Sequence, residues 1–127
     1  LGEFCALGES LKFLADAKGN EKAMILGEGV DAATQGILDN GHSPSRKVGE
    51  PDNRDSHYWF ARYWAEALAR QDKNAELADF FAPIAEALAE LAASQGKVAD
   101  LGGYYHADEA KVEKVMRPSE TLNAIFS

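Results

Sequence analysis

The spacing of apolar side chains predicts two successive helices in residues 1–41. Apolar residues recur every three or four positions between Phe4 and Leu14, and charged residues occupy the other faces. Gly19 is expected to end this helix, and Asn20 is a suitable N-cap for the next one. The apolar seam of the second helix consists of Ala23, Leu26, Val30, Ala33 and Ile37.

Glycines are frequent in this second helix. Gly41 follows it in the usual position after a helix C-terminus. Gly27, Gly29 and Gly36 lie inside it, and each should weaken an isolated helix by about 1 kcal/mol relative to alanine. We therefore expect this helix to depend on packing against its neighbours.

A third helix is predicted after a loop at residues 42–53. Asp55 or Ser56 can serve as its N-cap, and it should run to about Arg70. Aromatic side chains at helical spacing belong to a core more often than to a stacking platform, and we interpret this helix accordingly. Its buried side is predicted to consist of Phe60, Ala61, Trp64 and Leu68.

A fourth helix is expected to start after Asp72 and to end at Gly96. One face carries Leu77, Phe80, Ile84, Leu88 and Leu91. Pro83 should kink or split this helix, because proline lacks the amide hydrogen and its ring clashes with the preceding turn.

The remaining residues lose the helical period. The stretch KVADLGGYYHAD, residues 97–108, is predicted to be an extended loop that lies across the helices. Asp108 can cap a short helix to about Met116, which Pro118 stops, and Ser119 can open a last turn. No segment shows a strand pattern.

The expected fold is therefore all-α, with four main helices and an irregular wrapping tail in a single domain, residues 1–127. Amphipathic seams of this kind become stable by packing on each other. The residues predicted to be buried are Phe4, Leu11, Leu26, Ile37, Trp64, Ile84 and Leu88.

Composition narrows the class of protein. A chain of 127 residues with a net charge of −8 is one acidic domain, and it lacks the basic stripe that nucleic-acid binding needs. No run of apolar residues is long enough to span a membrane, and no signal peptide is visible. The single cysteine, Cys5, forms no internal disulfide and fits a cytoplasmic protein. Because the sequence begins with Leu1 rather than methionine, we expect a processed or excised piece.

A cationic stretch differs from this acidic background. The sequence SPSRKVGEPDNR, residues 43–54, contains two prolines and a glycine and precedes the aromatic helix. Arg46 offers a planar fork for a phosphate or carboxylate, with Lys47 beside it, and a loop before a helix N-terminus adds backbone donors. Exposed cations are also common on solvated surfaces, so an anion site and a merely solvated loop both remain open.

Other chemistry is not indicated. The three histidines, His42, His57 and His106, have no metal-ligand spacing, and there is no second cysteine. The carboxylates of Glu50, Asp52 and Asp55 are interpreted as a solvated polar loop rather than an acid–base pair. Glycine-rich phosphate motifs are absent. We predict no catalytic residue and no metal ligand in this chain.

Several motifs, taken together and in order, resemble the C-terminal part of the monomeric-type NADP-dependent isocitrate dehydrogenases. They are LGEFCALGESLKFLA, SPSRKVGE, DNR followed by SH, YWAEALA, FAPIAEALAE, LGGYY and VMRPSETLNAI. The resemblance covers essentially the whole chain. It implies that the chain belongs to the smaller domain of a larger α/β enzyme, a domain built from both termini of the parent.

The resemblance also implies a function. The parent would convert isocitrate to 2-oxoglutarate by oxidative decarboxylation, with NADP and Mg²⁺ or Mn²⁺. The metal carboxylates and most isocitrate contacts would lie upstream of Leu1. Arg46 matches an arginine that helps to hold the 2′-phosphate of NADP, whereas two further phosphate contacts, a histidine and an arginine, also lie upstream. Arg54 and His57 match in position, and no ligand role is carried over to them.

The expected partners are thus the remainder of the parent chain, with isocitrate and NADP in the full enzyme, and neither nucleic acid nor membrane. The isolated chain is expected to be inactive. Pro51 stands where the family has an apolar residue, and Asp55 stands where it has a glycine. An aspartate would be awkward at that position if the backbone there needs a positive φ. The alternatives are a free-standing helical module that binds a protein or a phosphorylated ligand, and a purely structural scaffold.

Overall fold

The structure is a computed structural model, and it describes residues 1–72, 79 and 82–127. These residues form helices and no strand, so the prediction of an all-α fold is confirmed. The helices are α1 (Gly2–Lys18), α2 (Glu21–Asp39), α3 (Asn53–Asp72), α5 (Ile84–Ala93), α6 (Glu109–Met116) and α7 (Glu120–Ile125). Within the described ranges, no helix has both the length and the apolar character that crossing a membrane requires.

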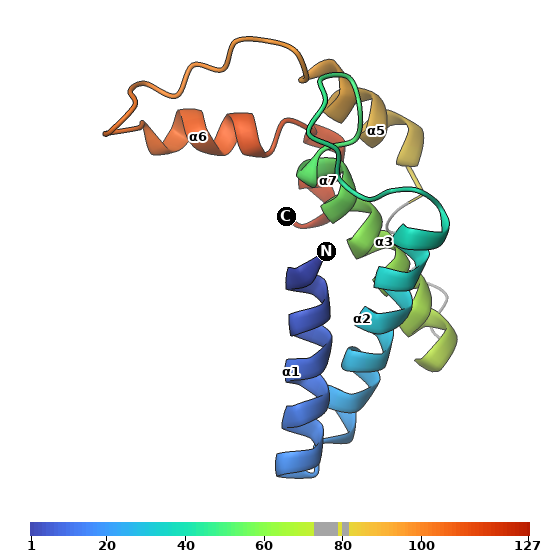
Figure 1. The fold of residues 1–127 in the computed structure, drawn as a ribbon. Helices are drawn as coiled ribbons and strands as arrows, with labels where there is room; N and C mark the ends of the chain where they lie inside the picture. The colour runs from blue at the N-terminus through green and yellow to red at the C-terminus, as the bar shows by residue number, and fades with distance from the viewer. Residues whose placement is uncertain (73–78, 80–81) are drawn as a thin grey trace.

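The helices form two groups joined by α3 (Figure 1). Helices α1 and α2 run antiparallel as a hairpin, and α2 also packs against α3. Helix α5 packs against α3 and α7. Helix α3 is therefore the element that connects the hairpin to the C-terminal helices.

Local capping signals confirm most of the predicted boundaries. Gly19 ends α1 with a φ of 62°, in the left-handed region. The side chain of Asn20 accepts from the amide of Ala23 at 3.2 Å and caps α2. Asp108 caps α6 by accepting from Lys111, and Ser119 caps α7 by accepting from Leu122, each at 3.0 Å.

The start of α3 was predicted wrongly. The helix begins at Asn53, so Asp55 and Ser56 lie inside its first turn rather than at the cap. The capping carboxylate belongs to Asp52, which accepts from the amide of Arg54 at 2.8 Å. Asp52 is favoured because its carboxylate is also paired with the Arg54 guanidinium, a contact that the capping pattern does not reveal.

Pro83 separates α5 from the chain before it. Helix α5 starts at Ile84, directly after this proline, and ends at Ala93, three residues before the predicted end at Gly96. The predicted helical start after Asp72, with Leu77 and Phe80, lies outside the described residues.

The buried apolar residues form two clusters. Phe4, Val30, Ala33, Ile37 and Phe60 make up the first, and Tyr58, Ala87 and Leu91 the second. Trp59 packs against both clusters, so its α3 position links them. Of the seven residues predicted to be buried, Phe4 and Ile37 are; the others, Leu11, Leu26, Trp64, Ile84 and Leu88, are partly buried.

The glycines of α2 allow α3 to approach closely. A Cβ atom built on Gly29 would lie 2.9 Å from the Trp64 indole, and one on Gly36 would lie 3.0 Å from the Tyr63 ring. The indole nitrogen of Trp64 donates to the Leu26 carbonyl at 3.2 Å. These glycines lower the helix propensity of α2 and in exchange permit packing that larger residues would prevent.

The tail does not lie across the helices as predicted. Residues 97–108 are exposed throughout, and the loop arches away from the other helices before α6 (Figure 1). The loop instead folds back on the start of α6, because the Asp108 amide donates to Leu101 and Lys111 pairs with Asp100 at 2.7 Å. The described helices present no apolar surface to Tyr104 and Tyr105, which are 93% and 88% exposed.

The last helix, by contrast, is attached firmly. The Glu90 carboxylate of α5 accepts from the Ser119 hydroxyl at 2.6 Å and from the Thr121 amide and hydroxyl at 3.0 and 2.8 Å. Hydrogen bonds from Ser119 and Thr121 lower the pKa of Glu90. Helix α7 is therefore held at its N-terminus, where a carboxylate is most favourable.

The close approach of α2 and α3 gives a testable prediction. Gly29→Ala should destabilise the 127-residue chain by about 1–3 kcal/mol, because the new methyl group overpacks against Trp64. Alanine has the higher helix propensity, so the opposite sign would be expected from propensity alone. Gly2→Ala, with open space around it, is the matched control. Urea unfolding midpoints measure both, and an equal or raised stability for Gly29→Ala would contradict the packing.

Candidate functional site

The cationic loop joins α2 to α3, and we call residues 42–52 the Arg46 loop. Its first residue is anchored on α3, because the His42 ring stacks on Trp59 with centroids 3.7 Å apart and planes 7° apart. The His42 amide also donates to the Ile37 carbonyl at 2.9 Å. Burial lowers the pKa of His42, and the positive charge of Arg62 lowers it further. A neutral ring thus packs on the aromatic helix.

Hydrogen bonds within the loop fix the backbone on both sides of Arg46. The Ser45 amide donates to the Pro51 carbonyl at 2.6 Å, and the Ser45 hydroxyl donates to the Glu50 carboxylate at 2.6 Å. The Lys47 amide donates to the same hydroxyl at 3.2 Å. Arg46 is therefore held between two residues whose positions are set by the far side of the loop.

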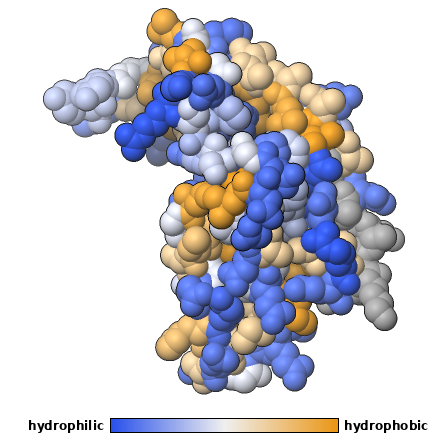
Figure 2. Space-filling model, turned by 45° about the vertical axis from the view of Figure 1, so that its right-hand side comes forward, coloured by the Kyte–Doolittle hydropathy of each residue, from blue (hydrophilic) through white to orange (hydrophobic). Residues whose placement is uncertain are grey.

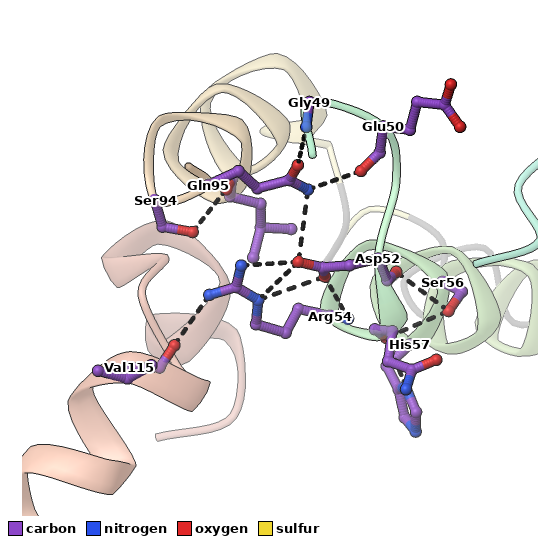
Figure 3. Close-up of polar contacts among 11 residues, drawn as sticks. Gly49, Glu50, Asp52, Arg54, Ser56, His57, Ser94, Gln95 and Val115 are labelled. Atoms are coloured by element: carbon purple, nitrogen blue, oxygen red, sulfur yellow. Dashed lines mark hydrogen bonds and ion pairs between the residues drawn. The ribbon is translucent and has the colours of Figure 1, made fainter. Parts of the chain in front are cut away.

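The end of the loop is held by an ion pair between Asp52 and Arg54. The Arg54 guanidinium donates to Asp52 at 2.7 Å and to the Val115 carbonyl of α6 at 2.9 Å (Figure 3). Partial burial alone would raise the pKa of Asp52, but the hydrogen bonds from Arg54 outweigh it and hold that pKa below its ordinary value. The charge of Arg54 is thus used within the fold.

Gln95, which follows the C-terminus of α5, contacts the loop from the opposite side. Its side-chain oxygen accepts from the Gly49 amide at 3.0 Å, and its side-chain nitrogen donates to the Glu50 carbonyl at 2.9 Å (Figure 3). The same nitrogen lies 3.4 Å from Asp52. Gly49, with a φ of 85°, provides the sharp turn that brings these backbone groups to Gln95.

An open groove of about 430 Å³ lies beside the loop. Its lining includes the cationic side chains of Arg46, Lys47, Arg54 and Lys97 and the carboxylate of Asp52. Lys47 is exposed and lies 3.9 Å from Glu50, a weak surface pair. Arg46 is exposed, and its side chain forms no ion pair or hydrogen bond with any residue that the structure describes. It is therefore available to an anion from outside the loop.

The remaining polar candidates are not brought together. His57 is exposed, with Nδ1 2.6 Å from the Asn53 carbonyl, and His106 lies in the exposed loop before α6. Among the residues that the structure describes, no three His, Cys, Asp or Glu side chains are placed to hold a metal ion.

Asp55 and Asp52 lie close together in sequence and differ in environment. Burial raises the pKa of Asp55, and the nearby charge of Asp52 adds to this effect. Asp55 lies in the first turn of α3 and has helical backbone geometry, so an aspartate at this position meets no positive φ. The interpretation of these two carboxylates as part of a solvated loop was wrong, because Asp55 is buried and Asp52 is paired with Arg54. Of the predicted buried side of α3, Phe60 is buried in the core, whereas Ala61, Trp64 and Leu68 are partly buried.

Sequence reasoning missed Gln95 and the structural role of Arg54. Both contacts join segments that are more than forty residues apart, and no local pattern marks them. Lys97 was missed for the same reason, because it reaches the groove from the exposed loop after α5.

A second, apolar groove of about 620 Å³ lies along α3 and α7. It is lined mainly by apolar and aromatic side chains, among them Leu26, Phe60, Trp64, Leu68, Leu122 and Ile125. Apolar side chains also reach the surface in several other places (Figure 2).

Comparison with known proteins places these features in a family. The chain matches the family model for monomeric isocitrate dehydrogenase over residues 1–127. It is 53% identical to isocitrate dehydrogenase [NADP] 2 of Colwellia maris and 51% identical to isocitrate dehydrogenase [NADP] of Azotobacter vinelandii, in each case over 100% of this chain and 18% of the relative. Isocitrate dehydrogenase [NADP] 2 of Mycobacterium tuberculosis is 46% identical over 98% of this chain and 18% of the relative. The chain therefore belongs to the monomeric isocitrate dehydrogenase family and spans 18% of the length of these relatives.

Proposed function

We propose that this chain is the C-terminal part of an NADP-dependent isocitrate dehydrogenase and that Arg46 contributes to the site for the 2′-phosphate of NADP. The observation that carries the proposal is the state of Arg46: an exposed guanidinium in a loop held by hydrogen bonds, without an ion pair to any described residue. The names of the relatives supply the cofactor.

The chemistry of the groove suits a phosphate dianion. A guanidinium can donate two parallel hydrogen bonds to phosphate oxygens, and Lys47 and Lys97 add positive charge along the same lining. Arg54 cannot serve in the same way, because Asp52 already neutralises it. Only NADP carries the 2′-phosphate, so Arg46 would favour NADP over NAD. The remaining phosphate contacts would come from upstream of Leu1.

The proposed reaction of the parent is the oxidative decarboxylation of isocitrate to 2-oxoglutarate in the cytoplasm. NADP would accept the hydride, and Mg²⁺ or Mn²⁺ would stabilise the negative charge that develops on the substrate. Its ligands are proposed to lie in the rest of the parent, as the family resemblance implies. The part played by this chain is to bind and orient one end of NADP.

The remainder of the parent chain is also the proposed occupant of the apolar groove along α3 and α7. The relatives extend well beyond the aligned segment, since this chain covers 18% of their length. The groove is lined by side chains such as Phe60, Trp64 and Leu122, and apolar surface has a higher free energy in contact with water than when it is buried. Contact with the remainder of the same polypeptide would remove this apolar surface from solvent.

The isolated chain should be inactive. Purified residues 1–127 should form no NADPH from isocitrate and NADP, because the proposed metal ligands and most substrate contacts lie elsewhere. NADPH absorbance measures the reaction, and the full-length parent is the positive control. Isocitrate-dependent turnover by a preparation free of full-length enzyme would contradict the assignment.

The apolar groove should make the isolated chain associate with itself or bind a hydrophobic dye. Light scattering and the fluorescence of anilinonaphthalene sulfonate report the two effects. In the full-length parent the dye signal per molecule should fall, because the groove is covered. An isolated chain that stays monomeric and binds no dye would show that the groove needs no cover and would support a free-standing module.

Removal of Arg46 should change cofactor preference in the parent. Arg46→Ala should weaken NADP binding by about 2 kcal/mol, or roughly thirtyfold, and leave NAD binding nearly unchanged. Arg46→Lys should recover part of the loss, because an ammonium lacks the planar fork. Added salt should reduce the difference between wild type and Arg46→Ala. Isothermal titration with each cofactor measures these effects.

Arg70→Ala is the matched control for that experiment. Arg70 is exposed in the last turn of α3, whereas the Arg46 loop leads into the first turn of the same helix. The two ends of this helix are about 25 Å apart at 1.5 Å per residue. Equal losses of NADP and NAD binding in Arg46→Ala would assign the loop a structural role instead.

A further inference from the structure

We propose that Gln95 is a positioning residue for Arg46 and thereby helps to set the preference for NADP over NAD. The inference rests on the proposed role of Arg46 in binding the 2′-phosphate. Gln95 itself does not need to touch the cofactor. Its side chain instead connects the Arg46 loop to the end of α5, through one accepted hydrogen bond and two donated ones, the longer of which reaches Asp52 (Figure 3).

The side-chain amide of Gln95 pairs with the backbone of two consecutive residues. Its oxygen faces the Gly49 amide at 3.0 Å, and its nitrogen faces the Glu50 carbonyl at 2.9 Å. The opposite orientation of the amide would place a donor against a donor and an acceptor against an acceptor, so the pairing is specific.

Gln95 can act as a fixed support because its own backbone is held. Its amide donates to the Ala92 carbonyl at 3.1 Å, and the preceding Ser94 hydroxyl donates to Leu91 at 2.7 Å. Leu91 is buried in the second core cluster. The support therefore extends from a core helix to the loop.

A short series of contacts connects Gln95 to Arg46. Gln95 binds the backbone of Glu50, the Glu50 carboxylate accepts from Ser45, and Ser45 directly precedes Arg46. The Ser45 hydroxyl also accepts from the Lys47 amide on the other side of Arg46. A shift at Glu50 is thereby passed to both neighbours of Arg46.

The internal bonds of the loop define its shape, but they do not fix its position relative to α5. Gln95 provides side-chain hydrogen bonds that do so, whereas the nearby Val48 side chain is 81% exposed. A bidentate contact with phosphate depends on both distance and angle. Without Gln95, Arg46 would sample positions from which its fork no longer meets the phosphate, and part of the NADP preference would be lost.

A double-mutant cycle in the full-length parent tests the proposal. Gln95→Ala, Arg46→Ala and the double variant are compared with wild type by measuring the dissociation constants of NADP and NAD. Gln95→Ala should lower the preference for NADP over NAD about fivefold, which corresponds to the net free energy of one hydrogen bond. In the Arg46→Ala background the same change should have no further effect, because the group that it positions is absent.

Two more variants separate the hydrogen bonds from other effects. Gln95→Met keeps the length of the side chain and loses all three of its hydrogen bonds to the loop, so it should match Gln95→Ala. Gln35→Ala removes an exposed glutamine that bonds Asp39 within α2, and it should leave the preference unchanged. Hydrogen exchange at the Gly49 amide should accelerate in both Gln95 variants and not in Gln35→Ala.

Three outcomes would overturn the inference. An unchanged preference in the Gln95 variants, with a lowered one in Arg46→Ala, would remove the role of Gln95 and leave the proposed function intact. Additive losses in the double variant would show that Gln95 does not act through Arg46. An unchanged preference in Arg46→Ala would refute the phosphate contact, and the role of Gln95 in cofactor preference would fail with it.

Discussion

The carboxylate of Asp52 is the contact on which the arrangement of the C-terminal half depends. It accepts from the Arg54 amide at the start of α3 and from the Arg54 guanidinium, which in turn reaches the Val115 carbonyl near the end of α6. The Gln95 nitrogen lies beside it at 3.4 Å. The carboxylate thus contacts α3 directly and Gln95 after α5, and it is connected to α6 through Arg54. Burial raises the pKa of Asp52, but the hydrogen bonds from Arg54 lower it by more and so favour the ionised form that these contacts need.

The same ion pair distinguishes the two arginines of the cationic stretch, Arg46 and Arg54. Arg54 is partly buried and pairs with Asp52, so its charge is neutralised within the fold. Arg46 lies eight residues earlier, is exposed, and has no such partner among the described residues. Both arginines look alike in the sequence, where each belongs to a matching motif. Their environments differ because the Asp52 carboxylate reaches Arg54 in the first turn of α3.

Features that depend on neighbouring residues were predicted well, and features that depend on remote contacts were not. Asn20, Asp108 and Ser119 were identified as caps because a cap is satisfied within three residues. The start of α3 was misplaced because Asp55 and Ser56 were taken as caps, whereas the capping carboxylate belongs to Asp52, which is also paired with Arg54. Gln95 gave no signal, since its partners are more than forty residues away. The predicted position of the 97–108 loop was wrong, because the prediction assumed that the loop packs on neighbouring helices.

Preorganisation supports the proposal that a segment covering 18% of its relatives' length contributes Arg46 to a cofactor site. The Arg46 loop is fixed by contacts with α3 and α5 and by its own hydrogen bonds, all of them within this chain. The entropy of ordering the loop is therefore lost during folding rather than when a ligand binds. Apolar surface is distributed differently, because the groove along α3 and α7 remains open. The geometry around Arg46 is thus set locally, whereas the burial of this groove requires a further partner.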